Sequence, residues 1–500
     1  MGKRINPRDS RNHKPSSGEP LKAWLLYAAP LLIALVVLWT RHIGGEPVEK
    51  DEQQTVQMAL NLWQGGTVSL DPVAPLKPSM QREPLPTAIT ALAVGMTDAV
   101  MGKAGAQAYM GGTRARWLRL QNVLWFTLLC ASVFGIVYSA TLSPVLALVG
   151  TGLVGVLPFT PGVVFRVDQL DTESLAAGLL LMSSFWMAVA IHRGRLGAAV
   201  AAGAAFGLLA LVKAATLYIF IGLIATLVFV CVLGPLRASI QRHLRSIAVM
   251  SLVFAVVVLP WMVRNHIYFG TFEIANRSAG VLYVRALKNG VTPTEYRGAF
   301  YVWAPSPLRG AVGKVLGFSR ADMMRGGSLQ RLNREGWSDF ADDDMRAQLA
   351  GRPEDVISFY RRGQAEMFKA RNELVAAGDP DPGTSAERAV RKRALNMIVE
   401  HPGKHLAVTI PFMWRGAVFT FPLLVLAMVY GIRDRRDELA LLALPAFGTV
   451  MFYALLTHFI PRYGSTVWPV AITTLCMVIA AWRESRHGAP AVAPHRMAGS

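Results

Sequence analysis

The chain has 500 residues, of which 53% are hydrophobic and 17% are charged, and its formal net charge is +19. This is more apolar surface than one water-soluble core of such a length needs, which excludes an ordinary soluble fold. A charge this positive would indicate nucleic-acid binding in a soluble protein. Here no recognition motif accompanies it, and many of the basic residues lie in short loops between apolar runs, as is typical of membrane proteins.

Membrane spans account for the apolar runs. About ten of these runs are long enough, as helices, to cross a hydrocarbon layer roughly 30 Å thick. In chain order they cover residues 23–40, 121–140, 142–159, 174–191, 196–211, 216–233, 247–263, 408–430, 439–458 and 465–482. The sequence therefore predicts an all-α polytopic membrane protein with about ten spans.

The positions of arginine predict the orientation of these spans. The polar tail 1–21 is expected to be disordered and cytoplasmic, and counting from it places the arginine-rich loops and the tail 484–500 inside. The outer regions are then 41–119 and 265–405. The predicted units are the tail 1–21, an N-terminal transmembrane module 22–264 with the outer loop 41–119, a periplasmic domain 265–405, C-terminal transmembrane helices 406–483 and the tail 484–500.

One apolar stretch, residues 87–101, does not fit this count. It is short, contains Asp98, and precedes the basic cluster Arg114, Arg116 and Arg119. The cluster by itself favours the cytoplasm, but a crossing here would move every later arginine loop to the outside. We therefore interpret 87–101 as an interfacial or re-entrant helix whose backbone is covered by protein. A model with eleven spans is the alternative.

The outer region 265–405 is large enough for a small domain. Residues 271–301 mix β-branched, aromatic and glycine residues, which predicts short strands or irregular loops. Residues 353–376 and 385–400 have helical periodicity and are separated by the turn sequence 378–383.

An amphipathic helix is predicted just after the first span. Its apolar positions Val56, Ala59, Leu60 and Trp63 repeat with helical spacing, and Gly65-Gly66 ends it. Asp51 and Glu52 then lie at its N-terminus, facing water at the mouth of the bundle. Acidic residues also stabilise a helix N-terminus, so a purely structural role remains an alternative for this pair.

Further short motifs follow this helix in a fixed order. They are Arg82-Glu-Pro-Leu, Asp171-Thr-Glu173-Ser-Leu, Trp261-Met-Val-Arg264-Asn265-His-Ile-Tyr-Phe-Gly, Glu400-His401-Pro402 and Pro461-Arg462-Tyr463. Together with the acidic pair they closely resemble the motifs of GT-C glycosyltransferases. This superfamily comprises polyprenyl-phosphate-sugar transferases, among them protein O-mannosyltransferases and the lipid A aminoarabinose transferase. The resemblance extends over residues 25–482.

The resemblance implies both a fold and an activity. The fold would be a GT-C-type transmembrane helix bundle with outer juxtamembrane helices and a small periplasmic domain. The activity would be transfer of a sugar, with inversion, from a polyprenyl-phosphate-linked donor to an envelope lipid, glycan or protein. It would take place on the outer face of the cytoplasmic membrane of a prokaryote. Neither the sugar nor the acceptor follows from the motifs.

Such a transfer needs a carboxylate near the attacking hydroxyl and cations near the phosphate leaving group. Asp51 is the predicted base, with Glu52 as the alternative, and Asp171 and Glu173 are further catalytic candidates. The cations predicted to bind the donor phosphate are Arg82, Lys213, Arg264 and Arg462. Lys213 interrupts an apolar region, where an unpaired charge is costly. The alternative for each cation is that it extends to lipid headgroups.

Secondary roles fall to residues near the same outer ends. Asp168 is a candidate for orienting the acceptor, as are Tyr463 and His458, although an ordinary interfacial histidine is the simpler interpretation of His458. A divalent cation is left open, with Asp51 and Asp171 as its candidate oxygen ligands.

Two other functions compete with transfer. A transporter or flippase of envelope precursors would share the many spans, but transporters typically have repeated halves and ionisable residues within spans. A non-catalytic envelope assembly protein on the same scaffold would tolerate loss of Asp51.

Overall fold

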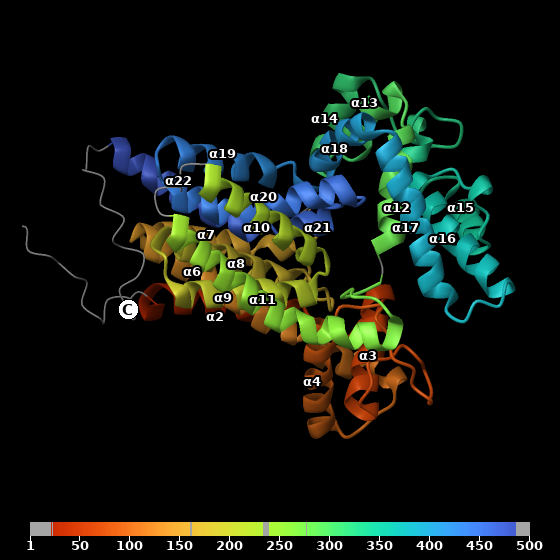
Figure 1. Cartoon of the computed structure of the whole chain (residues 1–500), viewed down its shortest axis with the longest axis horizontal. Coiled ribbons are helices and arrows are strands. Elements are labelled where there is room, and N and C mark those ends of the chain that lie inside the picture. Colours follow the sequence, from red (N-terminus) through yellow and green to blue (C-terminus); the bar gives the residue numbers. More distant parts are fainter. Residues whose placement is uncertain (1–21, 23, 161–162, 234–239, 277, 487–500) are drawn as a thin grey trace, which may run out of the picture.

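The computed structural model describes residues 22, 24–160, 163–233, 240–276 and 278–486. Within these residues the regular secondary structure is entirely helical, as predicted, and amounts to 77%. The predicted tail 1–21 and residues 487–500 lie outside the described part. Figure 1 shows a bundle of long helices with two groups of shorter helices at one end.

The helices of the bundle cover most of the residues predicted to lie in spans. Its helices are η1–α2 (Trp24–Ala28 and Ala29–His42), α6 (Gln121–Thr141), α7 (Pro144–Gly155), α8 (Glu173–Arg193), α9 (Leu196–Val212), α10 (Ala215–Leu233), α11 (Ile240–Phe269), α19 (Thr420–Arg433), α20 (Asp437–Leu456) and α22 (Trp468–Arg486). Among the described residues, seven helices are long and apolar enough to cross a membrane, or eight if one bent pair counts as a single span. α7 and α9 are shorter apolar helices.

Small residues let the central helices approach closely. A Cβ atom added at Gly203 of α9 would lie 2.4 Å from the carbonyl oxygen of Met250, and one at Gly207 would lie 2.7 Å from Cβ of Val257. Both neighbours belong to α11. Because only glycine permits this spacing, the backbones of α9 and α11 pack directly against each other, as small residues allow in membrane bundles.

The predicted continuous span 408–430 is wrong. Two helices, α18 (Pro402–Ala417) and α19, meet there at an angle of 102°. α18 is bonded to the region 265–405, because the indole N–H of Trp414 donates a hydrogen bond to the carbonyl of Phe300. Its Gly416 is packed so tightly that an added Cβ would lie 2.7 Å from the ring of Phe459. These contacts fix α18 across the end of α19.

A first group of outer helices follows α2. It consists of α3 (Lys50–Gly65), α4 (Pro84–Met101), η2 (Ala106–Tyr109) and α5 (Gly112–Arg119). α4 satisfies the length and hydropathy of a span, but Figure 1 shows it beside α3 and lying across the direction of the bundle helices. Asp98 of α4 accepts hydrogen bonds from Tyr109 and, at 3.3 Å, from Arg114. The charge within this apolar helix is therefore paired.

The second group of shorter helices lies within 265–405, the region that the sequence predicts to be a periplasmic domain. It holds α12 (Ser278–Leu287), η5 (Lys288–Gly290), α13 (Pro293–Val302), α14 (Ser306–Leu316), η6 (Ala321–Met323), η7 (Gln330–Leu332), α15 (Ala341–Leu349), η8 (Pro353–Asp355), α16 (Phe359–Ala376) and α17 (Pro382–Glu400). α16 and α17 agree with the predicted helical stretches. α17 starts at Pro382, inside the predicted turn, because the Asp381 side chain caps it by accepting from the backbone N–H of Thr384.

The prediction of strands or irregular loops in 271–301 is wrong, since α12 and α13 occupy most of that range. Two local features explain the helices. Thr292 and Glu295 form a capping box at the start of α13, with Pro293 in the first turn. Ala279 and Ala286 of α12 are buried in a small apolar cluster shared with α17. Tertiary packing thus outweighs the β propensity of the neighbouring side chains.

Candidate functional site

Asp51 lies in the first turn of α3, with Glu49 as the N-cap. Its side chain is 43% exposed and accepts a 2.6 Å hydrogen bond from Arg82. Arg82 also donates to the side chain of Gln54 and to the carbonyl of Asp51. Gly66 has φ 68° and ends the helix, as the Gly pair predicted. α3 therefore holds one partly exposed carboxylate at one end of the bundle.

Arg462 contacts the acidic residues at the turn before α8. Its guanidinium donates to Glu173 at 2.9 and 3.3 Å and lies 2.8 Å from a carboxylate oxygen of Asp171. A second oxygen of Asp51 lies 3.5 Å away. Lys213, at the end of α9, contacts Glu173 at 2.7 Å. The fold thus brings three predicted carboxylates and three predicted cations together, and we call this group the Arg462 cluster. Its members are Asp51, Arg82, Asp171, Glu173, Lys213 and Arg462.

The charges of the Arg462 cluster balance. Its three cations face three carboxylates, so they have counter-ions even when no phosphate is bound. Lys213 is tolerated at the end of an apolar helix because Glu173, only 1% exposed, is its partner. The three carboxylates are therefore the counter-ions of Arg82, Lys213 and Arg462, which the sequence alone could not identify.

The carboxyl group of Asp171 has a raised pKa. Burial and the nearby Glu173 raise its pKa to about 6, against the opposing effect of Arg462 and Lys213. Burial alone would lower the pKa of Arg462, but Glu173 and Asp171 raise it above its ordinary value. A carboxyl group whose pKa approaches neutrality is well suited to exchange protons at physiological pH.

Glu52 does not face water, contrary to the prediction. It is 5% exposed and accepts two hydrogen bonds from Arg119, at 2.9 and 3.0 Å. It also accepts the backbone N–H of Leu170 at 3.0 Å. Arg119 is itself only 2% exposed. No motif in the sequence pointed to a functional role for it. The pair ties the start of α3 to the turn that carries Asp171.

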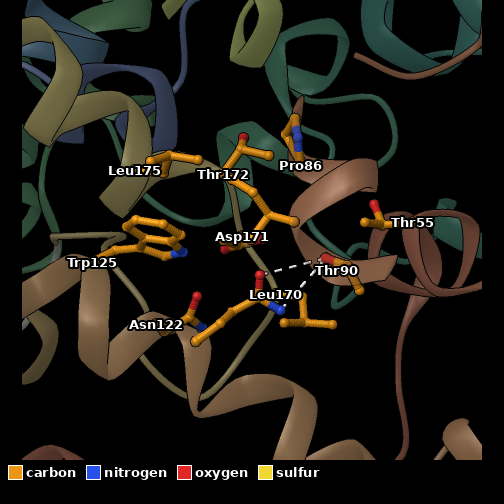
Figure 2. Close-up of a pocket in the computed structure, with 11 residues that line it drawn as sticks. Thr55, Pro86, Thr90, Asn122, Trp125, Leu170, Asp171, Thr172 and Leu175 are labelled. Carbon is orange, nitrogen blue, oxygen red and sulfur yellow. Dashed lines mark hydrogen bonds between the residues drawn. The ribbon is translucent and has the colours of Figure 1, made fainter. Parts of the chain in front are cut away.

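A pocket opens beside Asp171. It is lined by residues of α3, α4, α6, the turn before α8 and α8 itself, namely Thr55, Pro86, Ile89, Thr90, Gln121, Asn122, Trp125, Leu170, Asp171, Thr172 and Leu175. Figure 2 shows Asp171 near its centre, with Trp125 on one side and Thr90 on the other. A ligand in this pocket would therefore meet Asp171.

Arg264 and Asp168 are among the predicted residues that lie outside the Arg462 cluster. Arg264 donates to the carbonyl of Ser79 and to the side chain of Asn265, and it lies 4.5 Å from the ring centre of Trp261. These contacts are with neutral groups. Asp168 pairs with Arg166 through a 2.8 Å hydrogen bond.

Tyr463, which follows Arg462 in the chain, is in contact with His458. The Tyr463 ring stacks on that of Tyr453, with centres 5.0 Å apart, and is 5.7 Å from the His458 ring. His458 is 6% exposed. Burial and nearby cations, Lys288 first among them, hold the pKa of its imidazole well below its usual range.

Metal ligation does not fit the arrangement. In the described ranges, no group of three or more His, Cys, Asp or Glu side chains is placed to hold a metal ion. Asp51 and Asp171, the candidate ligands, both face the guanidinium of Arg462. A cation between them would have to displace that side chain.

No family model and no curated protein matches the chain. Solved structures with similarity include the oligosaccharyltransferase of Archaeoglobus fulgidus in the apo form, at 13% identity and a TM-score of 0.46, over 96% of this chain and 54% of that one. Another is ArnT from Cupriavidus metallidurans bound to undecaprenyl phosphate, at 14% identity and a TM-score of 0.34, over 93% of this chain and 79% of that one. The chain spans about half the length of the archaeal enzyme.

Proposed function

We propose that this chain is a membrane glycosyltransferase that moves a sugar from a polyprenyl-phosphate-linked donor to an envelope acceptor. The reaction would occur with inversion, on the outer face of the cytoplasmic membrane of a prokaryote. One observation carries the proposal. A single guanidinium, that of Arg462, contacts Asp51, Asp171 and Glu173, which belong to motifs far apart in the sequence. Residues that the motif resemblance selected therefore meet at one site.

Asp51 is the proposed general base. It is the most exposed carboxylate of the Arg462 cluster, so an acceptor hydroxyl can reach it. As that oxygen bonds to the anomeric carbon, Asp51 takes its proton, and the bond from this carbon to the phosphate oxygen breaks. The bonding electrons leave with the phosphate. Attack from the side opposite the leaving group inverts the anomeric carbon.

The remaining members of the cluster orient Asp51 and shape the site. Arg82 fixes one oxygen of Asp51 and Arg462 lies near the other. When donor is bound, Arg82, Arg462 and Lys213 are the proposed stabilisers of the developing phosphate charge. Glu52 is a positioning residue in this proposal, because its oxygens are already occupied by Arg119 and Leu170.

The test compares envelope glycans and glycolipids, by mass spectrometry, from cells with the gene, without it, and with Asp51→Asn. Asn keeps the shape of Asp but cannot take a proton. One sugar should disappear both without the gene and in the variant, while membrane abundance stays normal. Asp355→Asn, in an exposed pair with Arg352, is the matched control and should restore the sugar.

Two results would contradict the proposal. Sugar transfer within a few fold of wild type in Asp51→Asn would remove Asp51 as the base. An unchanged glycan profile together with an altered flux of a small solute would favour the transporter.

A further inference from the structure

A second group of cations lies where the outer domain meets α18. Lys288 of η5 is 3% exposed, and its ammonium lies 5.2 Å from the ring centre of Trp303 and 4.9 Å from that of Phe412. The guanidinium of Arg415, on α18, lies 5.0 Å from the same Trp303 ring. Two cations therefore share one aromatic side chain.

His458 and Arg334 extend this group. Arg415 donates to the carbonyl of His458 at 3.3 Å. The Tyr360 ring lies 5.6 Å from the His458 ring and 5.0 Å from the guanidinium of Arg334. Lys288 and His458 are buried, whereas Arg334 and Arg415 are partly exposed.

These cations lack the carboxylates that balance the Arg462 cluster. In the part of the chain that the structure describes, no ion pair involves Lys288, Arg334 or Arg415. The carboxylate that interacts with Arg415 is Glu335, which is exposed. Burial, then Arg415, Arg334 and Arg285, hold the pKa of Lys288 well below its usual range. Buried charges in proteins are normally paired, because leaving them unpaired is costly.

One further atom indicates a ligand. Nδ1 of His458 is buried and has no hydrogen-bond partner among the described residues. An imidazole nitrogen can donate a hydrogen bond when it carries the proton. The group thus offers an ammonium, two guanidinium groups and an unpartnered ring nitrogen.

We propose that Lys288, Arg334, Arg415 and His458 form a binding site for a phosphate group. Phosphate carries several acceptor oxygens and up to two negative charges, which suits Arg forks and a Lys point charge. His458 also contacts Tyr463, the neighbour of Arg462, so a phosphate bound here would lie beside the Arg462 cluster. Its source is either the headgroup of a polyprenyl lipid or a water-soluble phosphate ester.

The experiment measures equilibrium binding to the purified full chain in nanodiscs. Two radiolabelled probes separate the sources, undecaprenyl phosphate for the lipid and glycerol 3-phosphate for the soluble ester. We expect one of them to bind, with the Kd raised ten-fold or more in Lys288→Met and in Arg334→Gln. Arg320→Gln is the matched control, because Arg320 also lies on an aromatic ring, that of Trp337, but on the exposed surface.

Phosphate binding at this site can be tested independently of the proposed sugar transfer, since binding requires no turnover. Asp51→Asn should bind the probe like wild type, so loss of transfer and loss of binding are distinguishable. Lys288→Met should melt no lower than wild type, because Met replaces a buried polar amine that lacks a carboxylate partner with an apolar chain. The proposal is overturned if neither probe binds wild type, if both variants bind normally, or if Lys288→Met melts several degrees lower while Arg334→Gln still binds.

Discussion

Nε of Arg462 donates to Oε1 of Glu173 across 2.9 Å, although 289 positions separate the two residues in the chain. Glu173 begins α8, and Arg462 lies in α21 (Pro461–Ser465), the short helix between α20 and α22. Both residues are therefore fixed at the same end of the bundle by helices that pack against each other. The ion pair joins the first half of the chain to its last helices at the Arg462 cluster.

Arg462→Lys should reduce sugar transfer on the order of ten-fold or more. A guanidinium can serve Asp171 and Glu173 simultaneously through its fork, whereas a Lys ammonium is a single point of charge. The measurement is turnover of purified protein with a polyprenyl-phosphate-linked sugar. Arg352→Lys, at an exposed pair with Asp355, serves as the control and should leave turnover unchanged. Wild-type turnover in Arg462→Lys would mean that the fork has no role in transfer.

The buried pair of Arg119 and Glu52 predicts a strong asymmetry between single and double variants. Arg119→Met leaves the Glu52 carboxylate buried without its two-pronged partner, which should cost roughly 3–5 kcal/mol. Replacing both residues, Arg119→Met with Glu52→Leu, should recover most of this loss because no unpaired charge remains. Thermal unfolding in detergent, followed for both variants and wild type, gives the comparison. A double variant no more stable than Arg119→Met would contradict the argument.

Helices and helix ends that depend on neighbouring residues were predicted correctly from the local sequence pattern. The helix after the first span forms as expected and ends at Gly66, since apolar spacing and a positive-φ glycine act within a few residues. The apolar runs likewise become helices in the bundle, and α16 follows its periodicity. The motif resemblance selected Asp51, Asp171 and Arg462, which the fold then brings into contact.

Ion pairs and packing contacts between residues far apart in the chain could not be predicted from the sequence. Arg119 and Glu52 are 67 positions apart, and neither periodicity nor composition pairs them. The basic cluster after α4 seemed misplaced outside the membrane because its partners were unknown. Arg114 in fact pairs with Asp98, and Arg119 with Glu52. The placement of α18 at its bend with α19 likewise involves a distant residue, since Gly416 packs against Phe459.

Asp171 should make stability depend on pH. Burial and Glu173 raise its pKa to about 6 in the folded protein, above the unfolded value of about 4. An acid with a raised folded pKa contributes stability that is present below about pH 4 and is lost as the pH rises through about 6. Asp171→Asn mimics the protonated form. It should match wild type at low pH and melt a few degrees higher at pH 7.5.

Differential scanning fluorimetry across this pH range checks the prediction. Asp355→Asn corrects for the removal of one exposed carboxylate. If Asp171→Asn melts lower than wild type at pH 7.5, the ion pair with Arg462 outweighs burial and the direction of the shift is wrong.

The last prediction is that α4 does not cross the membrane, because it runs beside a helix that cannot. α3 contains Lys50, Asp51 and Glu52 together with several amides, too polar for a span. The two helices are linked at both ends. Arg82, just before α4, bonds to Asp51 at the start of α3, and Gln64 at the end of α3 donates to the carbonyl of Ala104, just after α4.

The last turn of α3 also packs against the second half of α4, since a Cβ added at Gly95 would lie 2.5 Å from the Trp63 ring. The helices therefore run side by side in the same direction, and a crossing by α4 would carry α3 with it. Residue 103, at the end of α4, should then lie on the same side as the outer domain.

Single cysteines test this arrangement with a membrane-impermeant thiol reagent on intact cells. Lys103→Cys, Gly290→Cys and Gly383→Cys, all at exposed positions, should react from outside. Arg195→Cys, in the loop between α8 and α9, should react only after the membrane is permeabilised. Background labelling should be low because the native cysteines are buried. If Lys103→Cys reacts only after permeabilisation while Gly383→Cys reacts at once, α4 crosses the membrane and the chain has an additional span.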